Sequence, residues 1–248
     1  MNTRVFLAGA TGAIGKRLIP LLLRGGAVVF GTTRSNARSD ELQSSGIEAI
    51  VVDVFNAPAL TQAMVQVEPD VVVHQLTDLA LIHDRNRLTE ALTRNARLRT
   101  EGTRNLVAAA VEAGARRVIA QSIGWIYAPG PEPHTEEDPL NLDATGMAAI
   151  TVQGVVALEQ AVLAARQIEG IVLRYGWLYG PGTGTGVAAG SPPLHVDAAA
   201  QAAVLAIERG VPGIYNIAEP SPLVSAEKAR RELGWDPDFR VAESTTSP

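Results

Sequence analysis

The sequence opens with Arg4-Val5-Phe6-Leu7-Ala8, followed at once by Gly9-Ala10-Thr11-Gly12-Ala13-Ile14-Gly15. The first five residues predict a buried β-strand, and the glycines lead from it into a predicted helix. Glycine permits a sharp turn and a close approach of the backbone to a diphosphate, while the helix start offers unpaired N–H groups. A glycine pattern alone is weak evidence for a nucleotide site, but here a predicted strand precedes it and a predicted helix follows it, which is the context that such a site requires. The stretch predicts a dinucleotide-binding turn at Gly9, Thr11, Gly12, Ala13, Ile14 and Gly15.

The rest of the chain alternates apolar, β-rich runs with helical patterns. This alternation predicts an α/β fold, a Rossmann-type doubly wound parallel sheet with helices on both faces. The predicted strands lie at Arg4–Ala8, Ala27–Thr32, Glu48–Val52, Val71–Gln75, Arg117–Gln121, Ile171–Arg174 and Gly213–Ile217. The predicted helices lie at Ala13–Arg24, Asp40–Ser45, Ala57–Val67, Arg87–Ala113, Met147–Gln167, Asp197–Arg209 and Ser225–Leu233. Two loops rich in proline and glycine follow strands, at Ala128–Pro139 and Gly180–Pro193.

Composition narrows the classes of partner. The net charge of the 248-residue chain is −5 and its basic residues are scattered, so we expect no nucleic-acid partner and no membrane partner. There is no cysteine, which excludes disulfides and cysteine-bound metals, and no metal site is predicted. No leader pattern and no segment of membrane-spanning length stand out, so we expect a cytoplasmic protein.

The charge after the second predicted strand indicates which dinucleotide binds. Arg34 lies nineteen positions after the last glycine of the turn, between Thr33 and Ser35. At this distance an acidic residue accepts from the ribose of NAD, whereas arginine neutralises the 2′-phosphate of NADP. NADP(H) is therefore favoured over NAD(H), with Arg38 and Arg17 as assisting cations. The alternative is that Arg34 is an ordinary solvated loop residue.

The ends of the third and fourth predicted strands add further cofactor contacts. Asp53 and Val54 end the third strand, where a carboxylate can receive the adenine amino group. Gln75, Leu76 and Thr77 end the fourth, beside the expected pyrophosphate and ribose. Both placements rest on the topology of a doubly wound sheet.

Several motifs in order resemble the extended short-chain dehydrogenase/reductase family, the NAD-dependent epimerase/dehydratase group. Besides the glycine turn, they are Val71-Val72-Val73-His74-Gln75-Leu76, Glu101-Gly102-Thr103-Arg104-Asn105-Leu106, Arg174-Tyr175-Gly176-Trp177-Leu178-Tyr179-Gly180-Pro181-Gly182, His195-Val196-Asp197 and Lys228-Ala229-Arg230-Arg231-Glu232-Leu233-Gly234-Trp235. The resemblance covers nearly the whole chain and implies an NAD(P)-dependent oxidoreductase.

The chain departs from this family at the residues that move protons. The family uses a Tyr-x-x-x-Lys pair on the helix after the fifth strand, and the lysine lowers the pKa of the phenol. Aligning on Glu159 places Thr151 and Val155 at those two positions. No tyrosine or lysine occurs anywhere between Ala128 and Arg174. The active site is therefore atypical.

Two hydroxyls remain as candidate catalytic groups. The resemblance places Ser122 within one residue of the family's serine, where it can bind a substrate carbonyl or satisfy the strand end. Tyr127 is the candidate substitute acid, although the matching tyrosine is usually structural in the family. His74 is interpreted as a packed strand-end residue rather than a base.

The family's substrate-binding lobe is abbreviated here. The segments Gly182–His195 and Asn216–Lys228 are short compared with those of the relatives. We therefore expect a single NAD(P)-binding Rossmann domain over residues 1–248, with a reduced substrate lobe formed by about 176–195 and 218–248. A compact substrate is favoured over a nucleotide sugar.

The helix predicted at Met147–Gln167 is apolar around most of its circumference, so it must be covered on two sides. We expect a homodimer through the helices near 87–113 and 147–167, or else coverage by the chain's own C-terminal segment.

Three functions remain open. The first is an NADP(H)-dependent oxidoreductase acting on a small carbonyl or alcohol without the usual dyad. The second is a non-redox isomerase, cyclase or lyase on the same fold. The third is a non-catalytic NAD(P)-sensing binding protein.

Overall fold

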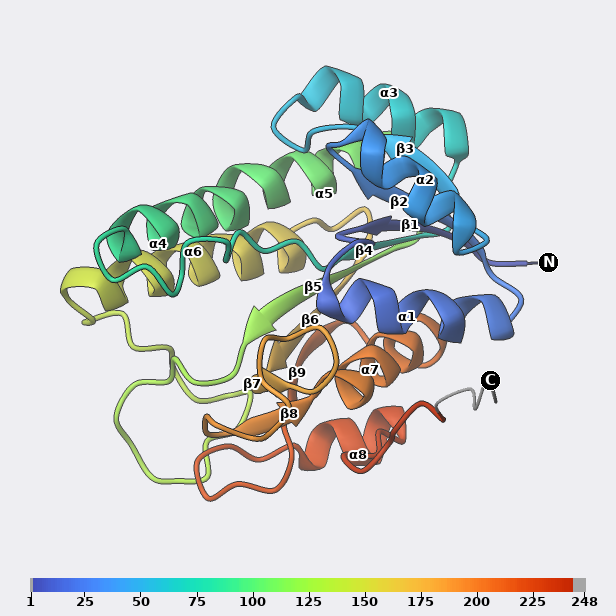
Figure 1. Cartoon of the computed structure of the whole chain (residues 1–248). Coiled ribbons are helices and arrows are strands. Elements are labelled where there is room, and N and C mark those ends of the chain that lie inside the picture. Colours follow the sequence, from blue (N-terminus) through green and yellow to red (C-terminus); the bar gives the residue numbers. More distant parts are fainter. Residues whose placement is uncertain (1, 243–248) are drawn as a thin grey trace.

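The structure is a computed structural model that describes residues 2–242, and strands alternate with helices along it (Figure 1). The strands are β1 (Arg4–Ala8), β2 (Val28–Thr33), β3 (Glu48–Val51), β4 (Val71–His74), β5 (Arg117–Ile123), β6 (Glu169–Tyr175), β7 (Trp177–Tyr179), β8 (Pro193–His195) and β9 (Gly213–Ile217). The helices are α1 (Ala13–Arg24), α2 (Asn36–Ser44), α3 (Ala57–Val67), α4 (Leu88–Arg97), the π-helix η1 (Leu98–Gly102), α5 (Thr103–Glu112), α6 (Gly146–Leu163), α7 (Val196–Glu208) and α8 (Glu227–Leu233).

Seven strands form one parallel sheet in the order β3-β2-β1-β4-β5-β6-β9. Val5 of β1 pairs with Val29 on one side and Val71 on the other. The strand order reverses at β1, so the connections from β1 and β4 leave the sheet in opposite directions. A crevice opens at such a switch point, at the carboxyl ends of the strands. The predicted Rossmann-type fold is confirmed.

Helices cover both faces of the sheet. Figure 1 shows α3, α4, α5 and α6 on one face and α1, α7 and α8 on the other. One apolar cluster joins the sheet to α1, α7 and α8, and Leu42 of α2 packs into it. A second cluster joins the opposite face to α3, α5 and α6 through Leu60, Leu106 and Leu158. These two cores hold the strand ends in fixed positions.

The helix predicted at 87–113 is interrupted in the structure. It consists of α4, η1 and α5, which follow one another without a break in the helical backbone. A π-turn inserts an extra residue into the helix, and such turns are frequent at functional sites. The periodicity of apolar residues could not reveal it, because the flanking helices keep their own pattern.

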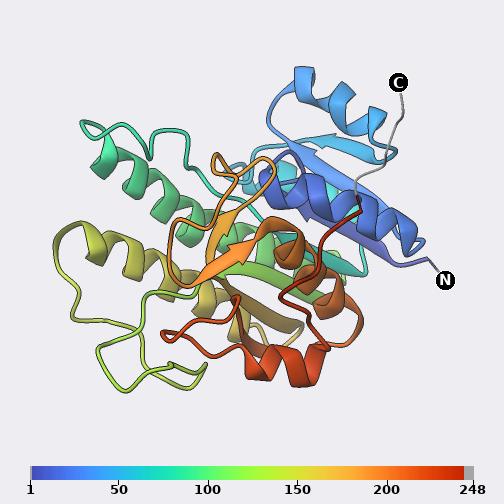
Figure 2. The same ribbon diagram turned by 60° about the horizontal axis from the view of Figure 1, so that its bottom comes forward.

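Two short strands were not predicted. β7 and β8 pair in parallel, with Trp177 opposite Pro193 and Tyr179 opposite His195, and β8 begins at the last residue of the loop predicted over 180–193. Figure 2 shows this ribbon in orange, in front of the main sheet. Three-residue strands carry no periodic signal, and their pairing joins distant segments, so the sequence could not indicate them.

The most apolar helix is α6. It has 18 residues and a mean hydropathy of 1.4, which makes it long and apolar enough to cross a membrane by length and composition alone. The expectation that no segment has this length was wrong. The physical reason is that Val152, Val155, Leu158 and Val162 pack into the interior of the fold. Of its residues 33% are buried within the chain, and the large apolar side chains Met147 and Leu163 are exposed at 47% and 40%.

Candidate functional site

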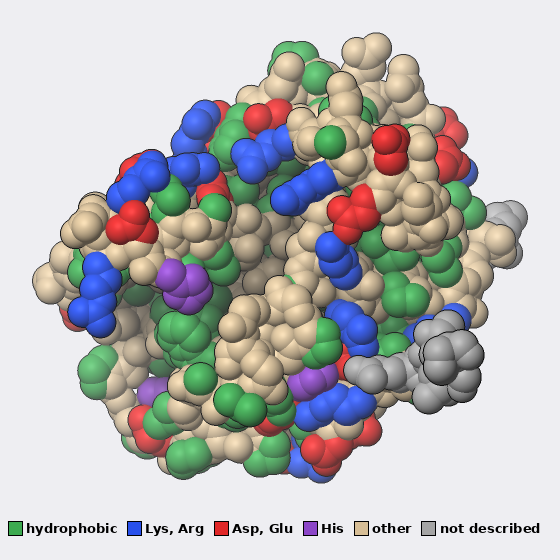
Figure 3. Space-filling view, in the orientation of Figure 1, with side chains coloured by type: hydrophobic (Ala, Val, Ile, Leu, Met, Phe, Trp, Pro, Cys, Tyr) green, Lys and Arg blue, Asp and Glu red, His purple; other side chains and the backbone are tan. Residues whose placement is uncertain are grey.

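A cleft of about 710 Å³ opens at the carboxyl ends of β1 to β4, and we call it the glycine-turn cleft. It is lined by Gly9, Thr11, Gly12, Thr32, Thr33, Arg34, Ser35, Arg38, Val52, Asp53, Val54, Phe55, Gln75, Leu76, Thr77 and Leu98. Eleven of the fourteen predicted cofactor residues are in this lining, and the other three, Ala13, Ile14 and Gly15, start α1 directly behind it. Figure 3 shows this face hollowed near its centre, with Lys and Arg side chains on the upper and right rims.

The glycine turn leaves room for a diphosphate. Gly9 has φ +96°, and a Cβ there would lie 2.7 Å from the carbonyl carbon and oxygen of Gln75. A Cβ at Gly15 would lie 2.3 Å from the carbonyl oxygen of Gly9, so this glycine lets α1 pack against the turn. Gly12 precedes α1 and no side chain caps that helix, so its first N–H groups face the cleft unpaired. The residues present therefore fit a nicotinamide dinucleotide.

Two arginines stand at the β2 side of the cleft. Arg34 and Arg38 are both exposed, and Arg38 Nη1 donates to Thr11 Oγ1 over 3.4 Å. The carboxylate in the cleft lining is Asp53 at the end of β3, whose Oδ1 accepts from the Phe55 amide at 3.0 Å. The β2 end is thus positively charged, which suits a phosphate group.

Arg17 does not join these cations. Its Nε and Nη2 donate to the two carboxylate oxygens of Asp197 at 2.5 and 3.1 Å. Asp197 is 2% exposed and lies at the start of α7. The expectation that Arg17 assists at the cofactor phosphate was wrong, because this pairing joins α1 to α7 instead.

The end of β4 supplies one free acceptor. Gln75 is buried at the cleft, and its Nε2 donates to the Tyr175 hydroxyl at 3.3 Å. Its Oε1 has no partner among residues 2–242. A buried acceptor without a partner costs free energy, so this atom is ready to receive a hydrogen bond from a bound molecule.

His74 is a structural residue, as interpreted from the sequence. Its Nε2 lies 3.0 Å from Thr103 Oγ1, and its Nδ1 accepts from the Leu76 amide at 3.2 Å. Burial, with the charge of Arg99 adding to it, lowers the pKa of His74 to about 4. The ring is therefore neutral near pH 7 and both nitrogens are occupied.

Ser122 belongs to a buried network. Its hydroxyl donates to Glu159 Oε1 at 2.8 Å, and the side chain is fully buried. The same carboxylate receives Nε and Nη2 of Arg174 at 2.9 and 2.7 Å. Breaking a buried, paired charge costs several kcal/mol, about 3–5, so these contacts fix the ends of β5 and β6.

The Tyr127 hydroxyl also has two buried partners. It donates to Asn216 Oδ1 at 2.5 Å and accepts from Arg174 Nη1 at 2.9 Å. Burial raises the pKa of Tyr127 despite the neighbouring Arg174 cation. The contacts of Ser122 and Tyr127 favour a positioning role, and a catalytic role for either stays a prediction.

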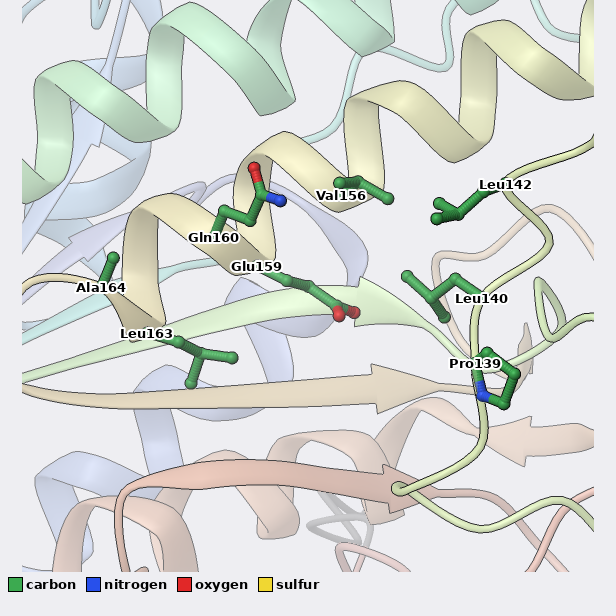
Figure 4. A pocket seen from close by; sticks show the side chains of 8 residues that line it. All are labelled: Pro139, Leu140, Leu142, Val156, Glu159, Gln160, Leu163 and Ala164. Atoms are coloured by element: carbon green, nitrogen blue, oxygen red, sulfur yellow. The ribbon is translucent and has the colours of Figure 1, made fainter.

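A second hollow, of about 570 Å³, lies beside α6 (Figure 4). We call it the α6 hollow, and it is lined by Pro139, Leu140, Leu142, Val156, Glu159, Gln160, Leu163 and Ala164. Its lining is apolar except for Gln160 and Glu159, and the carboxylate of Glu159 is held by Arg174. The hollow lies beside the helix and not at the carboxyl ends of the strands, so it is not the catalytic crevice.

Comparison with protein-family models gives a match that includes the glycine turn and most of the sheet. The NAD dependent epimerase/dehydratase family matches over residues 5–193. The chain belongs to this family. The resemblance found in the sequence is confirmed, and the chain is an NAD(P)-dependent enzyme of the oxidoreductase type.

Two curated relatives show the range of chemistry. A 3-diazoavenalumate denitrifying reductase from Streptomyces is 42% identical over 246 residues, which is 90% of this chain and 78% of that protein. A UDP-N-acetyl-alpha-D-glucosaminuronate decarboxylase from Bacillus cytotoxicus is 26% identical over 207 residues, 81% of this chain and 62% of that protein. The chain therefore spans less than two thirds of the decarboxylase.

Solved structures of the family share the fold at low identity. The UDP-glucose 4-epimerase of Thermotoga maritima, solved with UDP-glucose, has a TM-score of 0.76 and 16% identity, covering 96% of this chain and 94% of that one. The Thermus thermophilus UDP-glucose 4-epimerase complex with NAD has a TM-score of 0.72 and 20% identity, covering 96% and 95%. These likenesses establish the architecture.

Helix α6, on which the resemblance places the family's tyrosine and lysine, contains neither residue. Thr151 is half-buried on α6 and Val155 is fully buried there. Neither side chain has a pKa near neutrality. The loss of the family's proton-transfer pair stays a prediction.

Some lining residues were not predicted. Thr32, Val52, Phe55 and Leu98 also face the cleft. Phe55 directly follows the predicted Asp53-Val54 pair, so the strand end was a usable signal for it. Leu98 belongs to η1 and had no such signal, because a π-turn leaves no sequence pattern.

Proposed function

We propose that this chain is an NADP(H)-dependent reductase whose substrate is a small electrophile bearing a diazonium group. In the proposed reaction hydrogen replaces the diazonium group, and the protein donates no proton. The observation that carries the proposal is the missing Tyr-x-x-x-Lys dyad in a chain 42% identical to a diazo-compound reductase. The predicted reduced substrate lobe over about 176–195 and 218–248, of which residues 243–248 lie outside the described part of the chain, is consistent with a small substrate. The cytoplasmic location and single-domain organisation stay predictions.

The chemistry of the acceptor explains why the dyad can be dispensed with. A bound reduced nicotinamide supplies a hydride ion. Hydride added to a carbonyl leaves an alkoxide that needs a proton, and the buried Tyr127 has a raised pKa. Hydride added to a diazonium carbon forms a C–H bond while the C–N bond breaks, and N₂ leaves with that electron pair. Charge is balanced without any proton, so the protein needs only to bind and orient.

The cofactor preference rests on the β2 side of the cleft. Arg34 and Arg38 are exposed there, and the nearest lining carboxylate is at the end of β3. We propose that these arginines bind the 2′-phosphate of NADP(H). We also propose a homodimer through the helices near 87–113 and 147–167, because the exposed face of α6 is apolar.

The function is tested by supplying purified protein with NADPH and a panel of aryl diazonium salts, ketones and enones. We expect diazonium-dependent loss of reduced-cofactor absorbance, release of N₂, and transfer of deuterium from labelled NADPH to the former diazonium carbon. Reactions without protein and with heat-denatured protein correct for spontaneous reduction. Consumption of NADPH with ketones but not with diazonium salts would instead support the alternative that the protein reduces a small carbonyl compound. Turnover without cofactor consumption would indicate an isomerase or lyase, and NADPH binding without any turnover a sensor.

Tyr127→Phe separates hydride transfer without a proton from transfer with one. We expect the rate of this variant to stay within about threefold of the rate of the natural protein and to be independent of pH between about pH 6.5 and 9, because the proposed reaction needs no proton. Loss of a general acid would instead lower the rate by about 10²–10⁴-fold. A loss of that size, in a variant with an unchanged melting temperature, would make Tyr127 the proton donor and overturn the diazonium mechanism.

A further inference from the structure

Arg99 is a buried cation without a counter-ion. It lies in η1 and is 7% exposed, and no residue among 2–242 gives it a hydrogen bond or an ion pair. Burial lowers its pKa to about 10, so it stays charged at neutral pH. An isolated buried charge costs free energy unless something pairs with it. No contact among the described residues offsets the free energy of burying this cation.

The guanidinium is not sealed inside the protein. The buried polar side-chain atoms that lack partners among the described residues are Gln75 Oε1 and His134 Nδ1. The nitrogens of Arg99 also lack partners but are not in that group, so they retain contact with solvent. Part of the 7% exposure of Arg99 is therefore at its charged end.

The charged and titratable groups near Arg99 are already engaged. Glu159 of α6 is the nearest carboxylate, and its oxygens receive Arg174 and Ser122. His74 of β4 is neutral and bonded to Thr103. Among residues 2–242 no group forms an ion pair or a hydrogen bond with Arg99, so an oxygen atom of a bound molecule is a suitable partner for it.

The position of η1 links this cation to the cleft. Leu98, the preceding residue, lines the cleft, and the charge of Arg99 acts on His74 at the end of β4 and interacts with Glu159 of α6. On its other side η1 packs against α6, the helix that carries Val155. Because the adenosine half lies toward β2, the side toward β4 and η1 receives the nicotinamide half.

We propose that Arg99 is a permanently charged binding residue of this site and that its guanidinium binds oxygen atoms of the cofactor's nicotinamide half. Arg99 would thus supply from η1 the positive charge that the family's lysine supplies from the helix where this chain has Val155. This inference rests on the proposed cofactor. A guanidinium has five donors and does not lose a proton near neutrality, so it binds and orients without acting as an acid. That role matches a reaction that needs orientation but no proton.

The test measures binding in the absence of substrate. Titration of Arg99→Leu with NADPH, followed by fluorescence, is expected to show an affinity loss of about 10- to 100-fold, the range for hydrogen bonds to a charged group. Affinity for 2′,5′-ADP, which contains only the adenosine half, is expected to stay the same. Arg99→Lys is expected to restore most of the NADPH affinity. The matched control is Arg104→Leu, an exposed arginine on α5, which should leave both affinities unchanged.

Each other result has a distinct meaning. Unchanged NADPH affinity in Arg99→Leu overturns the inference, as does an equal loss for NADPH and 2′,5′-ADP, which indicates a structural role. Unchanged NADPH affinity with a raised KM for an anionic substrate assigns Arg99 to substrate binding instead. If the natural protein binds no nicotinamide nucleotide, the proposed function itself fails. Melting temperature checks the fold, and removal of an unpaired buried charge should not lower it.

Discussion

At the scale of single residues, the proposed preference for NADP(H) rests on Arg34. In Arg34→Glu the introduced carboxylate repels the 2′-phosphate of NADP(H) and can accept from the ribose hydroxyl of NAD(H). We expect the ratio of NADH to NADPH dissociation constants to fall by about 10- to 100-fold, the worth of one charged hydrogen bond. Arg166→Glu makes the same charge change at an exposed site outside the cleft lining and should leave the ratio unchanged. A natural protein that prefers NADH would show that Arg34 is only solvated.

The sequence predicted the location of residues whose place follows from their position in the chain, and it missed contacts that depend on distant partners. Arg34 was placed by its distance from the glycine turn, and the structure puts it in the cleft. Tyr127 looked free to donate a proton, but its partner Asn216 lies 89 positions away. Arg99 carried no signal, since its isolation follows from the packing of η1 and from the pairing of Glu159 with Arg174.

At the scale of elements, two substitutions in the glycine turn are expected to have different effects, one on cofactor binding and the other on stability. A Cβ at Gly12 would lie 3.3 Å from the Gly9 carbonyl oxygen, which small shifts accommodate. Gly12→Ala is therefore expected to fold with little loss of stability but to bind NADPH at least about tenfold more weakly, because the methyl group obstructs the phosphate. Gly15→Ala places a Cβ 2.3 Å from that oxygen and should cost about 1–3 kcal/mol of stability.

Titration calorimetry and urea unfolding measure these two effects. Gly186→Ala is the matched control, because no atom of residues 2–242 lies within 4 Å of a Cβ there and Gly186 has no positive φ. It should change neither binding nor stability. NADPH binding by Gly12→Ala at the natural affinity would remove the turn from the site.

The elements that the sequence predicted best are those with a local cause. β1, α1, α3 and β9 have the bounds expected from their apolar patterns and flanking glycine, proline or asparagine residues. α2 begins at Asn36 rather than Asp40, because Ser35 in an extended conformation starts the helix earlier. The ribbon of β7 and β8 and the π-turn η1 depend on tertiary pairing, which no local pattern encodes.

At the scale of the whole molecule, the two faces of the sheet are not equally covered. α7 is buried along most of its length, whereas α6 leaves Met147 and Leu163 exposed at 47% and 40%. Leu142, beside the α6 hollow, is 71% exposed. The described C-terminal segment lies with α8 on the other face of the sheet, so it does not provide the alternative cover considered from the sequence.

This uncovered face gives the homodimer a direct test. In Leu163→Glu a charge enters the apolar lining of the α6 hollow, and burying it against a second copy is unfavourable. We expect the natural protein to sediment as a dimer at micromolar concentration and Leu163→Glu as a monomer with an unchanged circular dichroism spectrum. Val211→Glu, at a 61% exposed valine between α7 and β9, should remain dimeric. A monomeric natural protein would contradict the assignment. Because the α6 hollow lies away from the glycine-turn cleft, the monomeric variant should still bind NADPH.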